Sequence, residues 1–412
     1  MSREVPEGWQ LEKLGSFVEE FKVLDSAGDL PPLSVTKSSG IVFQSDKFNK
    51  RIANASSGNY KVIKNGEYSY DPMSLYYGAI GRLKVCDVGI VSPAYITFRL
   101  QGALDTIFFD LYIKTRDFLV HVNKVTTGGN QDGKRKKTDW NSFCSLPIAL
   151  PPLHEQRRIA EILSSVDEAI AATRAVIEQT RKVKQGVLER LLTKGIGHTR
   201  FKQTEIGEIP EGWEVLCLEE IAEIDRGKFS VRPRNDPRYF GGDIPFVQTG
   251  DVVSADGRLI KHSQTLNQLG RGVSKEFPTG TILITIAANI GDTAITTYPV
   301  CCPDSVVGIV PNDGMNADWL REYLVLQKAS LDRQATQNAQ KNINLQHLRP
   351  LRVPVPSPDE QQRIGRRVEA LNGAISNNFE KLANLISLKS ALMSDLLTGR
   401  MRVTDALPMA AE

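Results

Sequence analysis

The chain has 412 residues, of which 41% are hydrophobic and 24% are charged. This composition is typical of globular proteins, excludes disordered or collagen-like chains, and predicts two or three domains at roughly 150 residues each. The net charge of +3 is too small for a polycation, so any nucleic-acid-binding surface has to be local. The sequence contains no apolar stretch near the roughly 20 residues that span a bilayer and no apolar secretion signal, so we expect a cytoplasmic protein.

An internal repeat organises the chain. The tetrapeptide Pro-Glu-Gly-Trp at residues 6–9 recurs at 210–213, an offset of 204. Two further matches share nearly the same offset: residues 155–159 return in degraded form at 360–364, and Leu-Leu-Thr at 191–193 returns at 396–398, both shifted by 205. Because three anchors agree, we predict two similar halves, each a globular region followed by a long helix.

The first globular region covers residues 1–150. Its short β-rich runs are punctuated by Gly, Pro and Asn, which predicts mixed α/β structure with irregular loops. A Gly-rich loop at 128–133 is followed by four consecutive basic residues, which we predict to contact DNA phosphates: Lys134, Arg135, Lys136 and Lys137. A basic run by itself is more often a solvated surface.

Residues 151–195 are predicted to form a helix of nearly forty residues, because apolar residues recur at three- and four-residue spacing. Two prolines precede it and Gly195 follows it. A helix this long is expected to pair with another one. The positions assigned to that pairing are Ile159, Val166, Ile170, Ile177 and Leu191.

Residues 196–355 comprise a linker and the second globular region, again of mixed α/β character. Five basic residues with one acid among them give a local charge of +4, with Phe229, Tyr239 and Phe240 interleaved. Guanidinium groups fit phosphates and guanine, and amides can pair with adenine. The predicted DNA contacts are Arg226, Lys228, Arg232, Arg234 and Arg238, with Gln340, Lys341 and Asn342 at the positions aligned with 135–137.

Residues 356–400 form the second predicted helix, and 401–412 a tail. Ser357, Pro358 and Glu360 supply a cap, a first-turn proline and a capping-box glutamate. Its predicted pairing positions are Ile364, Leu371, Ile375, Leu382 and Leu396. Two copies of one unit can imitate a twofold dimer, which would make the two helices an antiparallel coiled coil. The alternative is that each helix packs only on its own globular region.

Catalytic motifs are not apparent in the sequence. It has no HExxH, no paired cysteines with zinc spacing and no GxGxxG, and the stretch around Lys228 lacks the first glycine of a phosphate-binding loop. The Asp-Pro and Asn-Asp-Pro stretches at 71–72 and 235–237 lack the remainder of the amino-methyltransferase signature. We therefore expect no catalytic residue, no metal site and no bound cofactor.

The repeated features resemble those of the specificity subunit of type I restriction–modification systems. The resemblance covers the whole chain, through the two Pro-Glu-Gly-Trp segments, the run Leu-Pro-Pro-Leu-His-Glu-Gln-Arg-Arg-Ile at 150–159 and its degraded copy at 355–364. Residues 33–40, which contain Lys37, look like part of a first target-recognition domain, and residues 244–251, which contain Gln248, look like part of a second. Lys37 and Gln248 thereby join the candidate DNA contacts.

This resemblance implies that each globular region reads one half of a split, asymmetric site on double-stranded DNA. The antiparallel helices would set the unread spacer and dock two modification subunits, which bind S-adenosylmethionine and methylate adenine. Two restriction subunits that consume ATP with Mg²⁺ would complete the complex. Two other hypotheses stay open: a coiled-coil scaffold that binds only proteins, and an enzyme with an unrecognised site.

Overall fold

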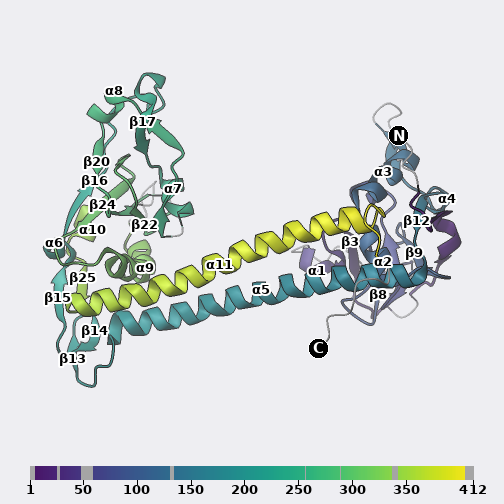
Figure 1. Ribbon diagram of the computed structural model, residues 1–412, viewed down its shortest axis with the longest axis horizontal. Helices are drawn as coiled ribbons and strands as arrows, with labels where there is room; N and C mark the ends of the chain where they lie inside the picture. Colours follow the sequence, from purple (N-terminus) through teal and green to yellow (C-terminus); the bar gives the residue numbers. More distant parts are fainter. Residues whose placement is uncertain are drawn as a thin grey trace. The chain divides into compact units, whose positions relative to one another are not determined.

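The computed structural model describes residues 5–25, 28–47, 59–129, 134–255, 257–287, 289–335 and 342–403 (Figure 1). The chain divides into two compact units. Unit 1 comprises Met1–Arg174 and Lys381–Glu412, and unit 2 comprises Ala175–Glu380. Each unit therefore contains a mixed α/β globular region and one half of each long helix. The prediction of mixed α/β structure with two long helices is confirmed.

Unit 1 is built around an antiparallel four-stranded sheet with smaller strand pairs beside it. The sheet order is β2 (Val18–Phe21), β9 (Ile96–Leu100), β6 (Tyr68–Tyr70), β7 (Ile80–Arg82). The smaller pairs are β1 (Gln10–Lys13) with β12 (Pro147–Leu150), β3 (Leu33–Thr36) with β4 (Gly40–Phe43), β5 (Lys61–Lys64) with β8 (Val88–Val91), and β10 (Thr127–Gly129) with β11 (Lys134–Lys137). Its short helices are α1 (Gln44–Lys47), α2 (Thr106–Tyr112), α3 (Arg116–Val125) and α4 (Trp140–Cys144).

Aromatic side chains fill the core of unit 1. Tyr68 stacks on Phe98 with ring centroids 5.2 Å apart, and the ring centroids of Tyr70 and Phe143 are 4.8 Å apart. All four rings are fully buried. Because aromatic residues favour the pleated surface of a strand and bury a large area, they place β6 and β9 at the centre of the sheet.

Unit 2 contains two larger sheets. The first has the order β16 (Ala222–Arg226), β24 (Val306–Pro311), β21 (Ile282–Thr285), β22 (Thr293–Thr296), β18 (Arg258–Leu259), and the second β19 (Gln264–Leu266), β17 (Phe240–Phe246), β23 (Val300–Cys302), β20 (Lys275–Phe277). Two antiparallel pairs accompany them, β13 (Phe201–Thr204) with β14 (Gly207–Pro210) and β15 (Glu214–Cys217) with β25 (Arg352–Val355). The helices are α6 (Leu218–Ile221), α7 (Thr249–Ser254), α8 (Gln268–Gly272), α9 (Ala317–Gln334) and α10 (Leu345–Leu348).

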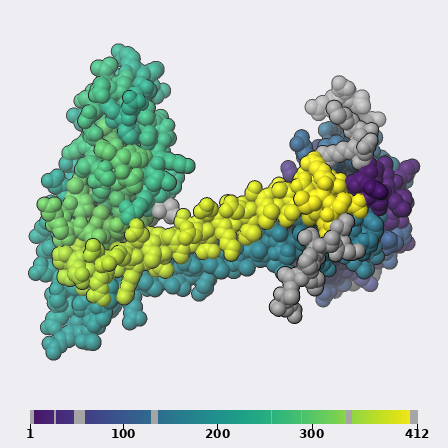
Figure 2. Space-filling view, in the orientation of Figure 1, coloured from purple at the N-terminus to yellow at the C-terminus, as the bar shows by residue number. Residues whose placement is uncertain are grey.

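The long helices are α5, Leu153–Lys194, and α11, Pro358–Leu396. In unit 1, Lys389 on α11 donates to the Asp167 carboxylate on α5 at 2.6 Å. In unit 2, the Arg181 guanidinium on α5 lies over the Phe379 ring on α11, 4.9 Å from its centroid. The first half of α5 thus pairs with the second half of α11 and the reverse, so the helices pack together antiparallel, as predicted (Figures 1 and 2). Within the described part of the chain, no helix combines the length and apolar character needed to cross a membrane.

The predicted pairing positions have three different environments. Ile159 and Leu396 are buried in the core of unit 1, and Leu191 and Ile364 in the core of unit 2. Three more are buried but belong to neither core: Ile170, Ile177 and Ile375. Val166, Leu371 and Leu382 are half-buried. The helix ends therefore anchor the two globular regions, while the middle positions bury the seam between helices.

The sequence repeat corresponds to a repeated junction at the start of each long helix. In unit 1, Trp9 Nε1 donates to Glu155 Oε2 at 3.2 Å; in unit 2, Trp213 Nε1 donates to Glu360 Oε2 at 2.9 Å. Both carboxylates are buried, 2% and 7% exposed. A buried carboxylate needs hydrogen-bond donors, so the tryptophan of each Pro-Glu-Gly-Trp segment and the glutamate of each helix start form one structural unit.

The glutamine that follows each glutamate repeats the same bonding. Gln156 accepts a hydrogen bond from the backbone N–H of Asp105 at 2.8 Å, and Gln361 accepts one from Asn316 at 2.9 Å. Asp105 and Asn316 are the N-cap residues of α2 and α9. Each glutamine therefore joins the start of a long helix to the start of a helix in the globular region.

The segment that follows each long helix bonds to the buried glutamate at the start of the other long helix. Past the end of α11, Arg402 donates to both Glu155 oxygens at 2.8 Å. Past the end of α5, His198 Nε2 lies 2.9 Å from Glu360 Oε1, which also accepts from the Ile196 N–H at 2.8 Å. The two junctions differ in the side chain that bonds the carboxylate, a guanidinium in unit 1 and an imidazole in unit 2.

Candidate nucleic-acid interface

In unit 1, two of the predicted lysines lie beside a pair of adjacent tyrosines. The rings of Tyr76 and Tyr77 have centroids 4.0 Å apart, and Lys136 Nζ lies 4.8 Å from the centroid of the Tyr76 ring. Lys37, in the turn between β3 and β4, lines a hollow of about 600 Å³ together with Tyr77, whose side chain is exposed. The structure thus brings Lys37 and Lys136 to one surface. We call Lys37, Tyr76, Tyr77 and Lys136 the unit 1 surface.

Sequence reasoning missed both tyrosines. They belong to a short 3₁₀ helix, Leu75–Tyr77, that is held by Gly78 in the left-handed conformation at φ 95°. The Tyr-Tyr-Gly sequence could have indicated an exposed aromatic turn. Aromatic faces next to ammonium groups can contact bases and phosphates at the same time.

Lys137 is exposed on β11 opposite Thr127, so the predicted basic run forms one strand of a hairpin. The side chains of Lys134 and Arg135 lie outside the described residues, as do Gln340 and Lys341. Asn342 is exposed and pairs with Ala287 in an isolated bridge. The repeat extends to this region, because the helices that follow have N-caps at Asp139 and Asn344, an offset of 205.

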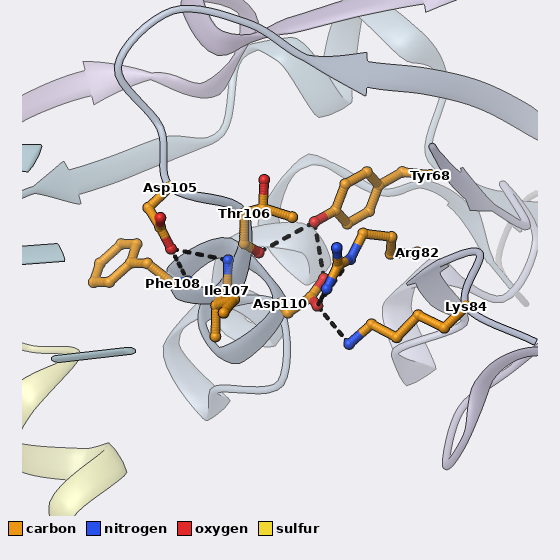
Figure 3. Close-up of polar contacts among 8 residues, drawn as sticks. All are labelled: Tyr68, Arg82, Lys84, Asp105, Thr106, Ile107, Phe108 and Asp110. Atoms are coloured by element: carbon orange, nitrogen blue, oxygen red, sulfur yellow. Dashed lines mark hydrogen bonds and ion pairs between the residues drawn. The ribbon is translucent and has the colours of Figure 1, made fainter. Parts of the chain in front are cut away.

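A charge network around the buried Asp110 of α2 joins this helix to β6 and β7 in unit 1 (Figure 3). Asp110 is 6% exposed and accepts a hydrogen bond from the Tyr68 hydroxyl at 2.8 Å. Two cations also approach it, Arg82 Nη2 at 2.8 Å and Lys84 Nζ at 2.7 Å. Burial first, and then the Asp110 charge, raises the pKa of Tyr68 far above its usual value. One carboxylate faces two cations, so the network carries a net positive charge to the surface, where the Lys84 side chain is 58% exposed.

In unit 2, the five predicted basic residues are all exposed. Asp304 holds two of them: its backbone oxygen accepts from Arg226 Nε at 2.5 Å, and its carboxylate pairs with Arg234 at 2.8 Å. Arg232 donates to the backbone oxygens of Phe229 and Val231. These bonds fix the direction of each guanidinium and leave some of its N–H groups free for a ligand.

Arg238 is held by the carboxylate of Asp236 through bonds of 3.0 and 2.6 Å. The Arg238 side-chain hydrogen bond holds the pKa of Asp236 below its usual value. Lys228 differs from the arginines, because its exposed side chain forms no hydrogen bond or ion pair with the described residues.

The aromatic residues between these cations have a structural role. Phe229 is only 4% exposed and packs against Phe246 and Phe240, with ring centroids 5.0 and 5.6 Å away. Phe229 therefore belongs to a buried aromatic cluster of unit 2, whereas the Tyr239 ring lies beside the Arg238 guanidinium, which is 5.9 Å from the ring centroid. Tyr239 and Phe240 are half-buried beside the same cluster. The arginines lie on a rigid aromatic support.

Gln248 lies next to a residue that sequence reasoning missed. It precedes α7 and donates from Nε2 to Gln264 Oε1 on β19 at 2.9 Å. Both glutamines line a hollow of about 570 Å³ that Arg234 and Asn235 also line. We call this hollow the unit 2 groove. Among the described residues, no group of three or more His, Cys, Asp or Glu side chains is arranged to hold a metal ion.

Comparison with known proteins places these features in a family. A family model described as "Type I restriction modification DNA specificity domain" matches residues 90–180 and 210–386, more than half of the chain. The chain is 26% identical to the type I restriction enzyme MjaVIII specificity subunit of Methanocaldococcus jannaschii over 97% of its own length and 94% of that protein. It is also 26% identical to the EcoBI specificity subunit of Escherichia coli, over 84% of this chain and 78% of that one. A further M. jannaschii relative is 32% identical, but the chain spans only 60% of its length.

Solved structures show the same fold. The HsdS subunit from Thermoanaerobacter tengcongensis superposes with a TM-score of 0.53 at 20% identity, covering 97% of this chain and 99% of that one. A chain from work on complex assembly and conformational transition of the type I R-M system superposes with a TM-score of 0.60 at 18% identity, covering 97% of this chain and 100% of that one.

Proposed function

Because the chain belongs to the family of type I restriction modification DNA specificity domains, we propose that it is the sequence-reading, non-catalytic subunit of a type I restriction–modification complex. Each unit reads one half of a bipartite, asymmetric DNA site. The observation that carries this proposal is the repeated junction: the same Trp–Glu and Gln–N-cap bonds join each globular region to the paired helices. One chain thereby presents two different reading surfaces on a common support.

The two surfaces differ in their chemistry, which suits an asymmetric site. The unit 1 surface combines tyrosine rings with lysines, whereas the unit 2 groove combines arginine with amides. Arginine and amide side chains read base edges, and ammonium groups next to aromatic rings bind the backbone and stack. Surfaces with different hydrogen-bonding groups select different base sequences in the two half-sites.

The long helices supply the spacing. At 1.5 Å per residue, the 42 residues of α5 extend over roughly 63 Å. Two binding modules on a stiff support bind with high effective concentration only when their sites have the matching separation. A DNA site with the wrong spacer engages one unit and loses the avidity of the second.

Methylation and cleavage belong to partner subunits in this proposal. Two modification subunits supply S-adenosylmethionine and methylate adenine, and two restriction subunits use ATP and Mg²⁺. The exposed apolar side chains along the helices are candidates for docking the modification subunits: Val176, Val183, Phe379, Ile386 and Leu388. A docked subunit would cover these side chains and remove their apolar surface from water.

A binding and transfer assay tests the proposal. The purified full chain is titrated against a random-sequence duplex at several salt concentrations, and separately incubated with that duplex and radiolabelled S-adenosylmethionine. We expect binding that weakens steeply with salt and no methyl transfer by the chain alone. Absence of binding at low salt would favour a scaffold that binds only proteins, and methyl transfer by the chain alone would favour an enzyme.

A further inference from the structure

The unit 2 groove has the donor and acceptor pattern of a base-reading site. Eight described residues line it, and none of them is acidic: Arg234, Asn235, Pro237, Phe240, Gly241, Gln248, Gln264 and Thr265. Carboxylates near bound DNA repel phosphates, so a hollow lined by amides, a hydroxyl and one guanidinium suits the edge of a base pair.

The segments that carry the two glutamines are tied together. Asp251 Oδ2 accepts from the backbone N–H of Gln248 at 2.8 Å and from the Ser263 hydroxyl at 2.9 Å. Ser263 directly precedes Gln264, and the Nε2 of Gln248 donates to Gln264 Oε1 at 2.9 Å. Both ends of the amide pair are therefore fixed before any ligand arrives, which lowers the entropy cost of ordering two long side chains on binding.

The bonded pair leaves a specific set of groups free. Gln248 uses one of its two N–H donors, so the same amide still offers one donor and its Oε1 acceptor. Gln264 keeps both of its donors. If Gln264 is instead the donor of this bond and Gln248 the acceptor, Gln264 offers the free donor and acceptor. The pair then presents the same set of hydrogen-bonding groups to a ligand.

Adenine is the base that complements this edge in the major groove. Its N6 amino group donates and its N7 accepts, so a glutamine amide can bond both atoms, and the spare donors of the second amide can reach the O4 of the paired thymine. Guanine presents two acceptors, which places its O6 against the amide oxygen. Cytosine presents a donor alone. An A·T pair is thus favoured over the other combinations.

Arg234 supplies the charge at the wall of the groove. Its guanidinium is aimed by the Asp304 carboxylate at 2.8 Å and retains N–H groups for a phosphate of the same strand. We propose that the Gln248–Gln264 amide pair reads an A·T base pair in the half-site bound by unit 2, with Arg234 fixing the register through the backbone. This inference rests on the proposed DNA-reading function and adds a base identity to it.

The test is a selection of duplex DNA from a random library by the full chain, carried out with the wild type and with Gln248→Ala, Gln264→Ala and Gln248→Glu. We expect the wild type to select two blocks, one of which contains an adenine that both alanine variants lose, with discrimination falling roughly 5- to 150-fold at that position. Glutamate accepts from the cytosine amino group, so Gln248→Glu should select cytosine there. The matched control is Gln268→Ala, an exposed glutamine of α8 that does not line the groove.

The outcomes distinguish the base-reading role of the two glutamines from the proposed DNA-reading function on which it rests. A change of one position in one block, with the other block unaltered, supports the inference. Selection of the wild-type sequence by all three variants, with circular dichroism showing that they are folded, would overturn it and leave the proposed function standing. If the wild type selects no sequence at all, both are wrong.

Discussion

Glu155 and Glu360 each place a buried carboxylate at the first turn of a long helix, where the helix dipole and several donors stabilise its charge. Burial by itself raises the pKa of Glu155, but the hydrogen bonds and charge of Arg402, with the Val403 N–H and Trp9, hold the pKa below its usual value. The carboxylate therefore stays ionised and closes the junction between the two ends of unit 1.

Replacement of this carboxylate by an amide tests its contribution. Glu155→Gln keeps the size of the side chain but loses the charge-assisted bonds to Arg402, so we expect the free energy of unfolding to fall by about 1–3 kcal/mol at pH 7. A carboxylate whose folded pKa is depressed stabilises above its unfolded pKa of about 4.3, and this contribution is lost as the pH falls through the folded pKa. The difference between wild type and variant should therefore shrink below about pH 4.

Urea denaturation between pH 7 and pH 3 measures this difference. The control is Glu161→Gln on the same helix, whose exposed carboxylate forms a surface ion pair with Arg158. A surface pair of this kind is worth roughly 0–1 kcal/mol, so the control should lose little stability. If Glu155→Gln lowers the free energy of unfolding by the same amount at pH 7 and at pH 3, the charge of Glu155 is not the source of the stabilisation.

The Lys228 side chain is exposed and has no partner among the described residues, so it is free to contact a ligand. If it contacts a phosphate, Lys228→Ala should weaken DNA binding and reduce the slope of log affinity against log salt by about 0.9. Lys228→Arg should restore the slope. The control, Lys202→Ala, removes the same charge from the exposed face of β13; equal effects of both alanine variants would mean that net charge alone is responsible.

The site could be predicted in part at this scale. Sequence clustering indicated the arginines of unit 2, but not that Asp304 lies some 70 residues from Arg234 and orients it. Likewise Gln248 was predicted through resemblance, whereas Gln264 and the Tyr76–Tyr77 pair were missed because only the tertiary structure brings them to the candidate surfaces. Side-chain partners distant in sequence leave no local periodic signal.

At the scale of elements, the long helices were the most predictable part, because apolar spacing of three and four residues sustained over about forty residues is typical of a helix and of no strand or loop. The same spacing does not by itself separate buried from exposed positions on the helices. Val183, Phe379 and Ile386 follow it, yet 39–46% of each is exposed. Most of the strands were not predictable individually, since they have two to seven residues and pair with distant partners, as Val18 does with Leu100.

A matched pair of substitutions on α5 tests the seam. Ile177 is 3% exposed and Val183 is 45% exposed. Ile177→Ala removes buried methyl groups and leaves a cavity, so we expect a loss of about 2–5 kcal/mol in the free energy of unfolding. Val183→Ala should change it by less than about 0.5 kcal/mol. Chemical denaturation followed by circular dichroism at 222 nm compares them, and equal losses would show that Ile177 does not pack in a seam.

At the scale of the whole molecule, the proposed spacing function depends on both helices together. Seven residues inserted after Arg174 in α5 and seven after Glu380 in α11 add roughly 10 Å to each helix. The DNA spacer should lengthen by about three base pairs, at 3.4 Å per pair, while both half-sites keep their sequences. Sequencing of DNA selected by the variant measures the spacer.

The control inserts seven residues in α5 only, so contacts between the helices, such as the ion pair of Asp167 with Lys389, cannot all keep their register. This variant should bind DNA with the original spacer and DNA with the longer spacer more weakly than the wild type binds its own site. An unchanged spacer after the paired insertion would exclude the helices as its determinant.

In the proposed function, one chain reads two separate half-sites. The most direct measurement expresses the chain with its modification subunit in cells that lack other adenine methylation, and maps the modified adenines across the genome. We predict that every methylated adenine lies within a motif of two short specified blocks, separated by a fixed number of unspecified base pairs. A single uninterrupted motif, or two blocks at variable separation, would contradict the account.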